Sequence, residues 1–373
     1  MLTRFCQWVV LSLLARTNIV LGRDFTVADP TFYRDVVLNG SIGLGESYMN
    51  KKWDSPDLAS FIEKVATSPL LMRVQWWLSW CYPFEVLRML LWYVLNPQSI
   101  TRSRVVGEQH YDLSTDMYEK MLSLPMMYTC AYWKDVDTLE TAQLQKMDLV
   151  CRKLQLKAGE RVLELGCGWG AFAIHAAKKY GCMVTALTIS REQQRYAQEQ
   201  AVVAGVADRV TFLFQDYREH RGVYDKVASI GLLEHAGWSN AQGFFEVVEQ
   251  SLAPNGLACI HSIVGRTNTP YGDPWINKYI FHGGAIPSYA SWVTALREVP
   301  LEIEDVHSLG TDYARTLRAW YDNFNAKCEM SPRFTRMWHF YLQVSEAQFR
   351  CRGLNLWQMV LSKGRRERYD APR

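Results

Sequence analysis

The chain has 373 residues, of which 49% are hydrophobic and 21% charged, and its formal net charge is +3. This composition is that of a globular protein and excludes a largely disordered chain. The nearly balanced charge argues against a dedicated nucleic-acid-binding protein, so we expect no nucleic acid partner. The nine cysteines form no C-x-x-C pair and show no zinc-site spacing, so we expect reduced thiols and no metal.

The first 100 or so residues are predicted to be mainly helical. The apolar stretch 5–15 superficially resembles a signal peptide, but we favour a helix there. A glycine-punctuated loop is expected at 40–46, and helix-like apolar spacing recurs at 61–65 and 70–95. Charged residues and Pro83 divide 70–95, so neither half reaches the roughly 20 apolar residues that span a bilayer. Residues 96–104 are predicted to be a linker.

From residue 139 onward the pattern alternates between helices and strands. Helices are predicted at 139–154, 171–179, 191–204 and 244–252, and strands at 162–165, 183–187, 210–214, 224–230 and 257–262. A turn at 254–256 is expected before the last strand. This alternation predicts a parallel sheet with helices on both faces, whose ligands bind beyond the carboxyl ends of the strands.

Three glycines, Gly166, Gly168 and Gly170, follow the first of these strands and precede a helix. Glycine lets the backbone turn tightly and approach a ligand closely. Dinucleotide sites share this architecture, but the G-x-G-x-G spacing with Glu164 two residues earlier better suits the amino-acid part of S-adenosylmethionine. A glycine-rich turn without a ligand is the alternative.

The second strand ends near Thr188 without the carboxylate that usually binds ribose hydroxyls, so Thr188 or Gln193 is expected to make those contacts. After the third strand, Asp216 is placed to meet the adenine edge. A helix cap or an ordinary loop aspartate explains Asp216 equally well from the pattern alone.

Several short sequence segments, spread along the chain, resemble those of the bacterial cyclopropane-fatty-acyl-phospholipid synthases. The segments occur in order at 39–49, 110–113, 128–133, 165–170, 187–190, 215–218, 234–237, 275–281, 312–317 and 356–358. The glycine loop alone is shared with many methyltransferases. The ten segments together are far more specific to the cyclopropane-fatty-acyl-phospholipid synthases.

The resemblance implies an α/β chain with a Rossmann-like class I methyltransferase fold, a mixed seven-stranded sheet and a smaller, mainly helical N-terminal domain. We expect a lipid-associating domain at 1–100 and a catalytic domain at 101–373. The implied reaction is methylene transfer from S-adenosylmethionine to the cis double bond of a phospholipid acyl chain. The implied cofactors are S-adenosylmethionine and bicarbonate, the latter as base.

The resemblance also implies site residues by position. The bicarbonate ligands would be Glu234, His261 and Tyr313 through side chains, with Cys130 and Ile263 through the backbone. The cofactor contacts would be Tyr128, Thr129, Gly166, Gly168, Thr188, Gln193, Asp216 and Tyr217. Taken alone, Glu234 is better explained as a loop residue and His261 as a buried core histidine, and the surrounding matching segments reverse that preference. Whether bicarbonate or Glu234 accepts the proton is open.

The expected partners are a lipid acyl substrate and a phospholipid bilayer surface, reached from the cytoplasm as a peripheral protein at the inner face of the membrane. The Trp-rich segment 70–95 is either an interfacial surface or an internally packed helical hairpin. The protein is also expected to be able to form a homodimer. Two alternatives remain: a methyltransferase acting on a lipid carbon or a small-molecule amine without ring closure, and a non-enzymatic lipid-binding protein.

Overall fold

The computed structural model describes residues 1–74, 115–237, 240–266, 272–364 and 368–373. The N-terminal part holds α1 (Leu2–Leu14), β1 (Thr26–Val27), α2 (Thr31–Met49), β2 (Trp53–Asp54) and α3 (Leu58–Thr67). The helices expected at 5–15 and 61–65 are confirmed as α1 and α3. The predicted linker, the boundary near residue 100 and the segment 70–95 from residue 75 on lie outside the described residues.

Helix α2 replaces the loop predicted at 40–46, and that prediction is wrong. Only Gly40 leaves the helical conformation, with φ 55° and ψ −128°, and it kinks the helix. Gly43 and Gly45 are close-packing positions: a Cβ on either would lie under 3.0 Å from the Asp35 carbonyl group or the Trp275 indole, respectively. These two glycines therefore allow close packing rather than a turn.

The remaining elements build the sheet and its helical layers. They are α7 (Thr115–Leu122), α8 (Leu139–Lys153), β3 (Arg161–Leu165), α9 (Ala171–Tyr180), β4 (Met183–Thr188), α10 (Arg191–Val203), β5 (Val210–Phe214), β6 (Tyr224–Ile230), α11 (Leu233–Ala236), α12 (Ala241–Ser251), β7 (Leu252–Gly265), α13 (Pro274–Tyr279), α14 (Tyr289–Leu296), β8 (Glu302–Ser308), α15 (Gly310–Lys327), α16 (Pro332–Arg350) and β9 (Leu354–Ser362). Every element predicted between residues 139 and 230 is confirmed, with ends that differ by at most one residue.

The turn predicted at 254–256 is wrong, because these residues lie within β7. The pairing of β7 with β6 shifts between Tyr224 and Lys226, whose partners are Leu252 and Leu257. Asn255 has a φ of 62° in this irregularity. The turn-forming residues are therefore accommodated as a bulge in a long strand.

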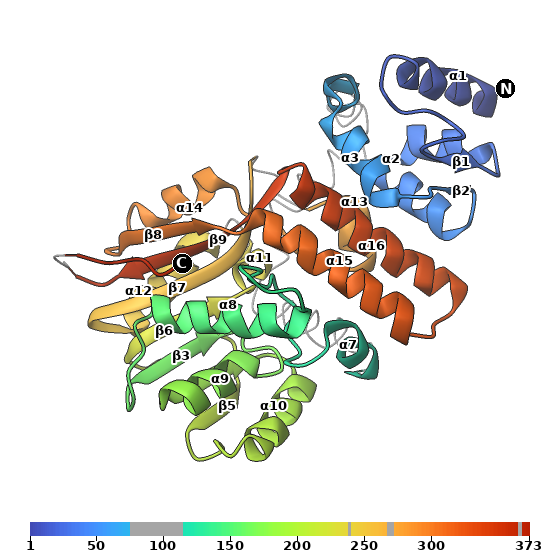
Figure 1. Ribbon diagram of the computed structural model, residues 1–373. Helices are drawn as coiled ribbons and strands as arrows, with labels where there is room; N and C mark the ends of the chain where they lie inside the picture. Colours follow the sequence, from blue (N-terminus) through green and yellow to red (C-terminus); the bar gives the residue numbers. More distant parts are fainter. Residues whose placement is uncertain (75–114, 238–239, 267–271, 365–367) are drawn as a thin grey trace.

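The sheet has seven strands in the order β5-β4-β3-β6-β7-β9-β8, and only β9 runs antiparallel to its neighbours. Helices α8, α9 and α10 cover one face of the sheet, and α12 and α14 cover the other (Figure 1). Their buried side chains form two separate hydrophobic clusters with the strands. The expected α/β fold with a mixed seven-stranded sheet is thus confirmed. Among the described residues, no helix is both long enough and apolar enough to cross a bilayer.

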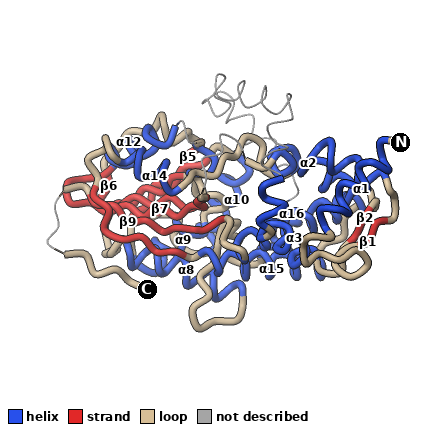
Figure 2. Tube along the Cα trace, turned by 90° about the horizontal axis from the view of Figure 1, so that it is seen from above, coloured by secondary structure: helices blue, strands red, loops and turns tan. Residues whose placement is uncertain are grey.

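The paired helices α15 and α16 lie between the sheet and the N-terminal helices in both views (Figures 1 and 2). They contact β9 on one side, and α16 contacts α2 and α3 on the other. One hydrophobic cluster joins Phe32 and Trp53 of the N-terminal part to Trp338 and Phe340 of α16. The N-terminal helices are therefore packed against the elements that flank the carboxyl edge of the sheet.

Candidate active site

A cavity of about 560 Å³ opens beside the carboxyl ends of β3 and β6, the strands between which the sheet order reverses. Open α/β sheets bind ligands at such a switch point, and the volume is typical of small-molecule sites. Its lining includes the predicted residues Tyr128, Thr129, Gly166, Gly168, Thr188, Gln193, Asp216, Tyr217, Glu234, Ile263 and Tyr313. Cys130 and His261 are not part of this lining.

The glycine loop between β3 and α9 forms one wall of the cavity. Gly168 has a φ of 53°, and a Cβ placed on it would meet no atom within 4 Å. The Cys167 amide donates to the Leu187 carbonyl oxygen at 2.8 Å, which ties the loop to β4. The loop is therefore fixed in place and leaves its backbone open to close approach by a ligand.

A buried acid and a buried base lie next to this loop. Glu164 is 1% exposed, its Oε2 atom has no hydrogen-bond partner, and burial raises its pKa well above the usual value. Lys146 of α8 donates from Nζ to Thr129 Oγ1 at 2.8 Å. Burial lowers the pKa of Lys146 to about 7, and the Glu164 charge acts in the opposite direction. Glu164 thus presents an unpartnered carboxyl oxygen in the cavity lining, and the buried Lys146 amine acts on its pKa.

Thr188 and Gln193 are held together at the end of β4. The Ser190 hydroxyl caps α10 by accepting from the Gln193 amide at 3.3 Å, which fixes the first turn of that helix. Thr188 Oγ1 then donates to Gln193 Oε1 at 2.9 Å. Both side chains line the cavity, so this pair can exchange hydrogen bonds with a ligand hydroxyl.

Asp216 lines the cavity but also forms an ion pair. Its Oδ1 atom accepts from Arg218 Nε at 2.8 Å, and its Oδ2 atom accepts from Arg218 Nη2 at 2.6 Å. This bidentate pair orients the carboxylate. The neighbouring Tyr217 has a buried hydroxyl without a partner in the described structure, and burial raises its pKa to about 12. Tyr217 therefore remains a protonated donor.

The segment 128–130 crosses the opposite side of the cavity. The Tyr128 hydroxyl donates to the Tyr341 hydroxyl at 2.9 Å. Cys130 is fully buried, its Sγ donates to the Ala131 carbonyl at 3.2 Å, and burial raises its pKa well above the usual thiol value. A thiol that resists ionisation is a poor nucleophile, so Cys130 can contribute only through its backbone.

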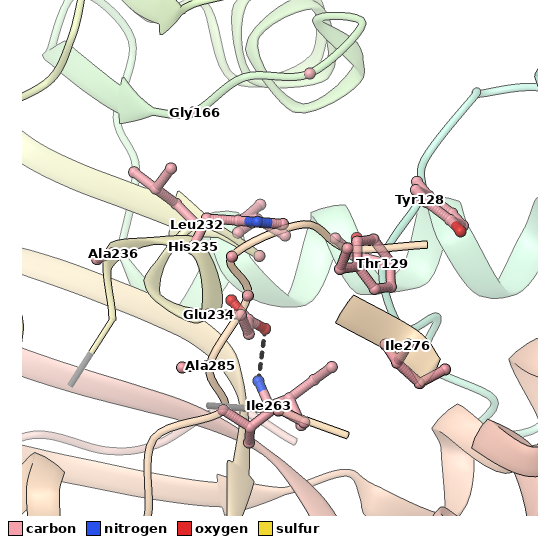
Figure 3. A pocket seen from close by; sticks show the side chains of 18 of the residues that line it. Tyr128, Thr129, Gly166, Leu232, Glu234, His235, Ala236, Ile263, Ile276 and Ala285 are labelled. Atoms are coloured by element: carbon pink, nitrogen blue, oxygen red, sulfur yellow. Dashed lines mark hydrogen bonds between the residues drawn. The ribbon is translucent and has the colours of Figure 1, made fainter. Parts of the chain in front are cut away.

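Glu234 of α11 is fixed by one of its two carboxylate oxygens. Its Oε1 atom accepts from the Ile263 amide at 2.7 Å, the hydrogen bond drawn in Figure 3. Its Oε2 atom is buried without a partner. Burial raises the pKa of this carboxyl to about 7, against the lowering effect of the Ile263 amide. Glu234 is therefore a held carboxyl group that can exchange a proton near neutral pH.

His261 of β7 is contacted by a side chain of the neighbouring strand β9. Gln358 Nε2 lies 3.2 Å from His261 Nδ1, and because an amide nitrogen only donates, the imidazole proton is placed on Nε2. His261 Nε2 is buried without a partner, and burial lowers the pKa of the ring well below its usual value. His261 is thus a neutral donor.

Aromatic side chains form much of the remaining wall. Tyr313 lies with its ring centroid 4.4 Å from that of Phe349, and Phe281 lies 6.0 Å from Tyr128 and 5.8 Å from Tyr341. All of these side chains line the cavity. Burial raises the pKa of Tyr313 well above its usual value, so its hydroxyl stays protonated. This region therefore offers a largely apolar surface to a ligand.

Two functional candidates were missed at the sequence level. Gln143 and Lys146 of α8 are fully buried, and Gln143 Nε2 donates to the Thr129 carbonyl at 2.9 Å. The missed signal is their spacing: both lie on the same helical face as the buried Ala142, Met147 and Val150. Polar side chains on an apolar face need partners, and here the partner is Thr129 of the cavity wall. No group of three or more possible metal ligands occurs in the described parts of the chain.

Comparisons with known proteins agree with this geometry. Residues 98–359 match the family described as mycolic acid cyclopropane synthetase. The chain is 40% identical over 361 residues to the cyclopropane-fatty-acyl-phospholipid synthase of Escherichia coli strain K12, covering 94% of this chain and 92% of that enzyme. It is 33% identical over 349 residues to the tuberculostearic acid methyltransferase UfaA1 of Mycobacterium tuberculosis, covering 88% and 80%.

A solved structure shows the same fold. The mycolic acid cyclopropane synthase CmaA1, complexed with SAH and CTAB, superposes with a TM-score of 0.65 and 28% sequence identity. The match covers 70% of this chain and 98% of that protein.

Proposed function

The chain belongs to the mycolic acid cyclopropane synthetase family and is an S-adenosylmethionine-dependent enzyme, and we propose that it converts the cis double bond of an unsaturated phospholipid acyl chain into a cyclopropane ring. The observation that carries this proposal is the Glu234 carboxyl group, with one oxygen held and the other buried and unpartnered at an apolar cavity. Ring closure must remove a proton after methyl transfer, and a held carboxyl group supplies a site for it.

S-adenosylmethionine supplies an electrophilic methyl group on a sulfonium. We assign its methionine part to Gly166 and Gly168, its ribose to Thr188 and Gln193, and its adenine to Asp216 and Tyr217, with Tyr128 and Thr129 closing the other side. The open backbone at Gly168 and the unpartnered Glu164 Oε2 support this assignment, because they offer the amino-acid part close approach and an acceptor for its ammonium. An isolated alkene is a poor nucleophile, so the pocket must hold both reactants in line.

The aromatic part of the cavity is assigned to the acyl chain. Methyl transfer to an alkene leaves a carbocation, which water would trap as an alcohol, so the wall around it must be dry. Tyr128, Phe281, Tyr313 and Phe349 line this region. Each aromatic face near a cation can stabilise it by about 0.5–2 kcal/mol.

Bicarbonate, when bound, would supply a base. The buried unpartnered atoms fit such an ion: Glu234 Oε2 accepts a hydrogen bond, while His261 Nε2 donates one. We add the Tyr313 hydroxyl and the Cys130 backbone to this set. The Ile263 amide already donates to Glu234 Oε1, so we assign it to holding that carboxylate. We assign Glu234 Oε2 as the final acceptor of the proton that is removed during ring closure.

The reaction is tested with vesicles of an unsaturated phospholipid and S-adenosylmethionine. The acyl chains are then analysed by mass spectrometry and by NMR for ring protons. A gain of one CH2 together with cyclopropyl protons is the expected result. A methyl-branched chain would favour methylation without ring closure, a candidate supported by the similarity to UfaA1. Unchanged lipid together with methylation of an added amine would favour the amine alternative.

We predict that Glu234→Gln, which keeps the shape of the side chain, loses ring formation by about 100-fold or more because the acceptor is removed. Cofactor affinity, measured by calorimetry with S-adenosylhomocysteine, should stay unchanged. Glu246→Gln, at an exposed position of α12, is the control and should retain full activity. Loss of cofactor affinity in Glu234→Gln would show that Glu234 belongs to the cofactor site instead.

We also propose that the protein works in the cytoplasm as a peripheral protein at the inner face of the membrane, where its lipid substrate lies. A homodimer is compatible with this arrangement and is tested by sedimentation.

A further inference from the structure

The outer face of α1 is an exposed apolar surface that carries aromatic side chains. Phe5 and Trp8 are 59% and 66% exposed and are the two exposed aromatic side chains in the described parts of the chain. Their ring centroids lie 6.3 Å apart, so they form one unit on the helix. Met1 and Leu2 of the same segment, and Val20 and Leu21 of the following loop, are also exposed. Apolar side chains gathered in this way mark an interaction site.

The outer side chains of α1 do not take part in the contacts that hold the helix against the rest of the protein. The helix is held through its opposite side, where Cys6 is 1% exposed and Val10 and Leu14 pack against the hydrophobic cluster. Residues 6, 10 and 14 lie four apart, so they form one stripe of the helix, whereas residues 5 and 8 lie on another. The outer aromatic side chains are thus left for a partner.

Charge indicates the chemistry of that partner. Residues 1–23 contain no aspartate or glutamate, and they contain Arg4, Arg16 and Arg23. Arg4 and Arg16 belong to α1 and to the turn after it, and both are exposed. An apolar helix face with tryptophan and phenylalanine flanked by arginines is the arrangement of helices that lie in the headgroup region of an anionic bilayer.

The packing connects this face to the cavity. α1 packs on α2, and α2 contacts α13 and α16. Helix α13 contributes Ile276 to the cavity wall, and α16 contributes Tyr341 and Val344. Glu46 of α2 accepts from Lys278 Nζ at 2.6 Å, which ties α2 to α13. A lipid surface bound at α1 would therefore be in contact with the body that contains the acyl-binding wall.

We propose that the Phe5–Trp8 face of α1 is a membrane-docking element that inserts its aromatic side chains between the headgroups of an anionic phospholipid surface. This inference rests on the proposed function, because it supplies the contact through which a lipid in a bilayer reaches the cavity. The partner that covers this face of α1 is therefore a lipid surface and not a second copy of the chain.

The test measures flotation of the full chain with vesicles of dioleoylphosphatidylglycerol and dioleoylphosphatidylcholine in equal amounts, and with vesicles of the latter alone. Phe5→Ser with Trp8→Ser should weaken binding to the mixed vesicles about ten-fold or more, because two inserted aromatic side chains are lost. Arg4→Gln with Arg16→Gln should reduce the preference for anionic vesicles by about 25-fold, since each arginine near such a surface contributes about five-fold.

The matched control is Val202→Ser with Val203→Ser in α10, where the side chains are 67% and 80% exposed but are not flanked by aromatic residues. It should bind vesicles like the wild type. Thermal unfolding of each variant checks that the fold is kept. Wild-type binding by the Phe5 and Trp8 variant would overturn the proposal, and so would loss of a wild-type dimer, seen by sedimentation, without loss of vesicle binding.

Activity separates this inference from the proposed function. The Phe5 and Trp8 variant should keep wild-type turnover on unsaturated phospholipid dispersed in detergent and lose it on vesicles. If the wild type makes no cyclopropane lipid in either form, the proposed function fails while the flotation result still decides the role of α1. Equal losses on detergent and vesicles would overturn the docking role.

Discussion

Two buried ionisable side chains near the cavity change their charge close to neutral pH. Burial raises the pKa of Glu234 to about 7 and lowers that of Lys146 to about 7. The same physical cause acts in opposite directions, because burial disfavours the charged form of each group. The two residues therefore make opposite contributions to the pH dependence of stability.

The stability contribution of Glu234 should decline as the pH rises. Its pKa in the folded protein lies above the usual value of 4.5, so the folded state holds the proton more tightly than the unfolded state between these values. This contribution is complete below pH 4.5 and is lost as the pH rises through about 7. The shift corresponds to about 3 kcal/mol of unfolding free energy.

We therefore predict that Glu234→Gln becomes more stable relative to the wild type as the pH is raised from about 5 to about 8. Thermal unfolding of the ligand-free proteins at several pH values measures this difference. Glu246→Gln, at an exposed position of α12, is measured alongside as the control. A difference between Glu234→Gln and the wild type that is independent of pH would contradict the burial of an ionisable carboxyl group at this position.

Lys146 is predicted to act as a positioning residue. Lys146→Met removes the hydrogen bond to Thr129. It also removes the ammonium group whose charge opposes the raised pKa of Glu164. We expect affinity for S-adenosylhomocysteine to fall by about ten-fold, as for the loss of one buried charge-assisted hydrogen bond. Calorimetry measures the change, and Lys178→Met at an exposed position of α9 is the control.

A pH series distinguishes this role from simple packing. The folded pKa of Lys146 lies below its usual value of 10.5, so its stability contribution is lost as the pH falls from there through about 7. The Met variant should therefore gain stability relative to the wild type as the pH falls through this range. Unchanged cofactor affinity, or a stability difference that does not vary with pH, would refute the assignment.

At the scale of elements, local patterns predicted the sheet strands well but failed where distant packing decides. β3 and the glycine loop follow from a short apolar run and three glycines, because a strand, a turn and a helix are all encoded nearby. The loop predicted at 40–46 failed because Gly43 and Gly45 serve contacts with Asp35 and Trp275, and the Trp275 contact joins positions far apart in the chain.

The same limit applies within the site. The pairing of His261 with Gln358 depends on the antiparallel register of β7 with β9. No local pattern reveals that register, so the donor at His261 Nε2 could not be assigned from sequence. The resemblance named His261 but gave no physical reason for its protonation. Gln143 and Lys146 could have been predicted as site residues from the sequence, because they are polar residues on an apolar face of a predicted helix.

We predict that Gly45→Ala destabilises the protein by about 1–3 kcal/mol, because its Cβ would overlap the Trp275 side chain. Gly243→Ala in α12 is the matched control, since a Cβ there meets no atom within 4 Å. That substitution should stabilise the helix by about 0.5–1 kcal/mol. Denaturant unfolding measures both, and equal effects at the two positions would contradict the packing role of Gly45.

At the scale of the whole molecule, the N-terminal helices share their contacts with the catalytic part. Arg336 of α16 lies over the Tyr48 ring at 3.8 Å and donates to the carbonyl oxygens of Tyr48 at 2.6 Å and Trp53 at 3.1 Å. An ion pair also joins Arg350 of α16 to Glu63 of α3 at 2.8 Å. We propose that the expected N-terminal and catalytic domains unfold together, because one hydrophobic cluster spans both.

Arg336→Ala tests this coupling. The substitution removes the partner of two backbone carbonyl groups, which we expect to cost about 2–3 kcal/mol and to lower the unfolding temperature by about 3 °C. Calorimetry should show one transition that shifts as a whole, and S-adenosylhomocysteine should raise that same transition. Arg195→Ala, at an exposed position of α10 where it pairs with Glu199 of the same helix, is the matched control and should leave the transition nearly unchanged. Two separate transitions, with only the lower one shifted by Arg336→Ala, would instead show that the N-terminal helices form an independent folding unit.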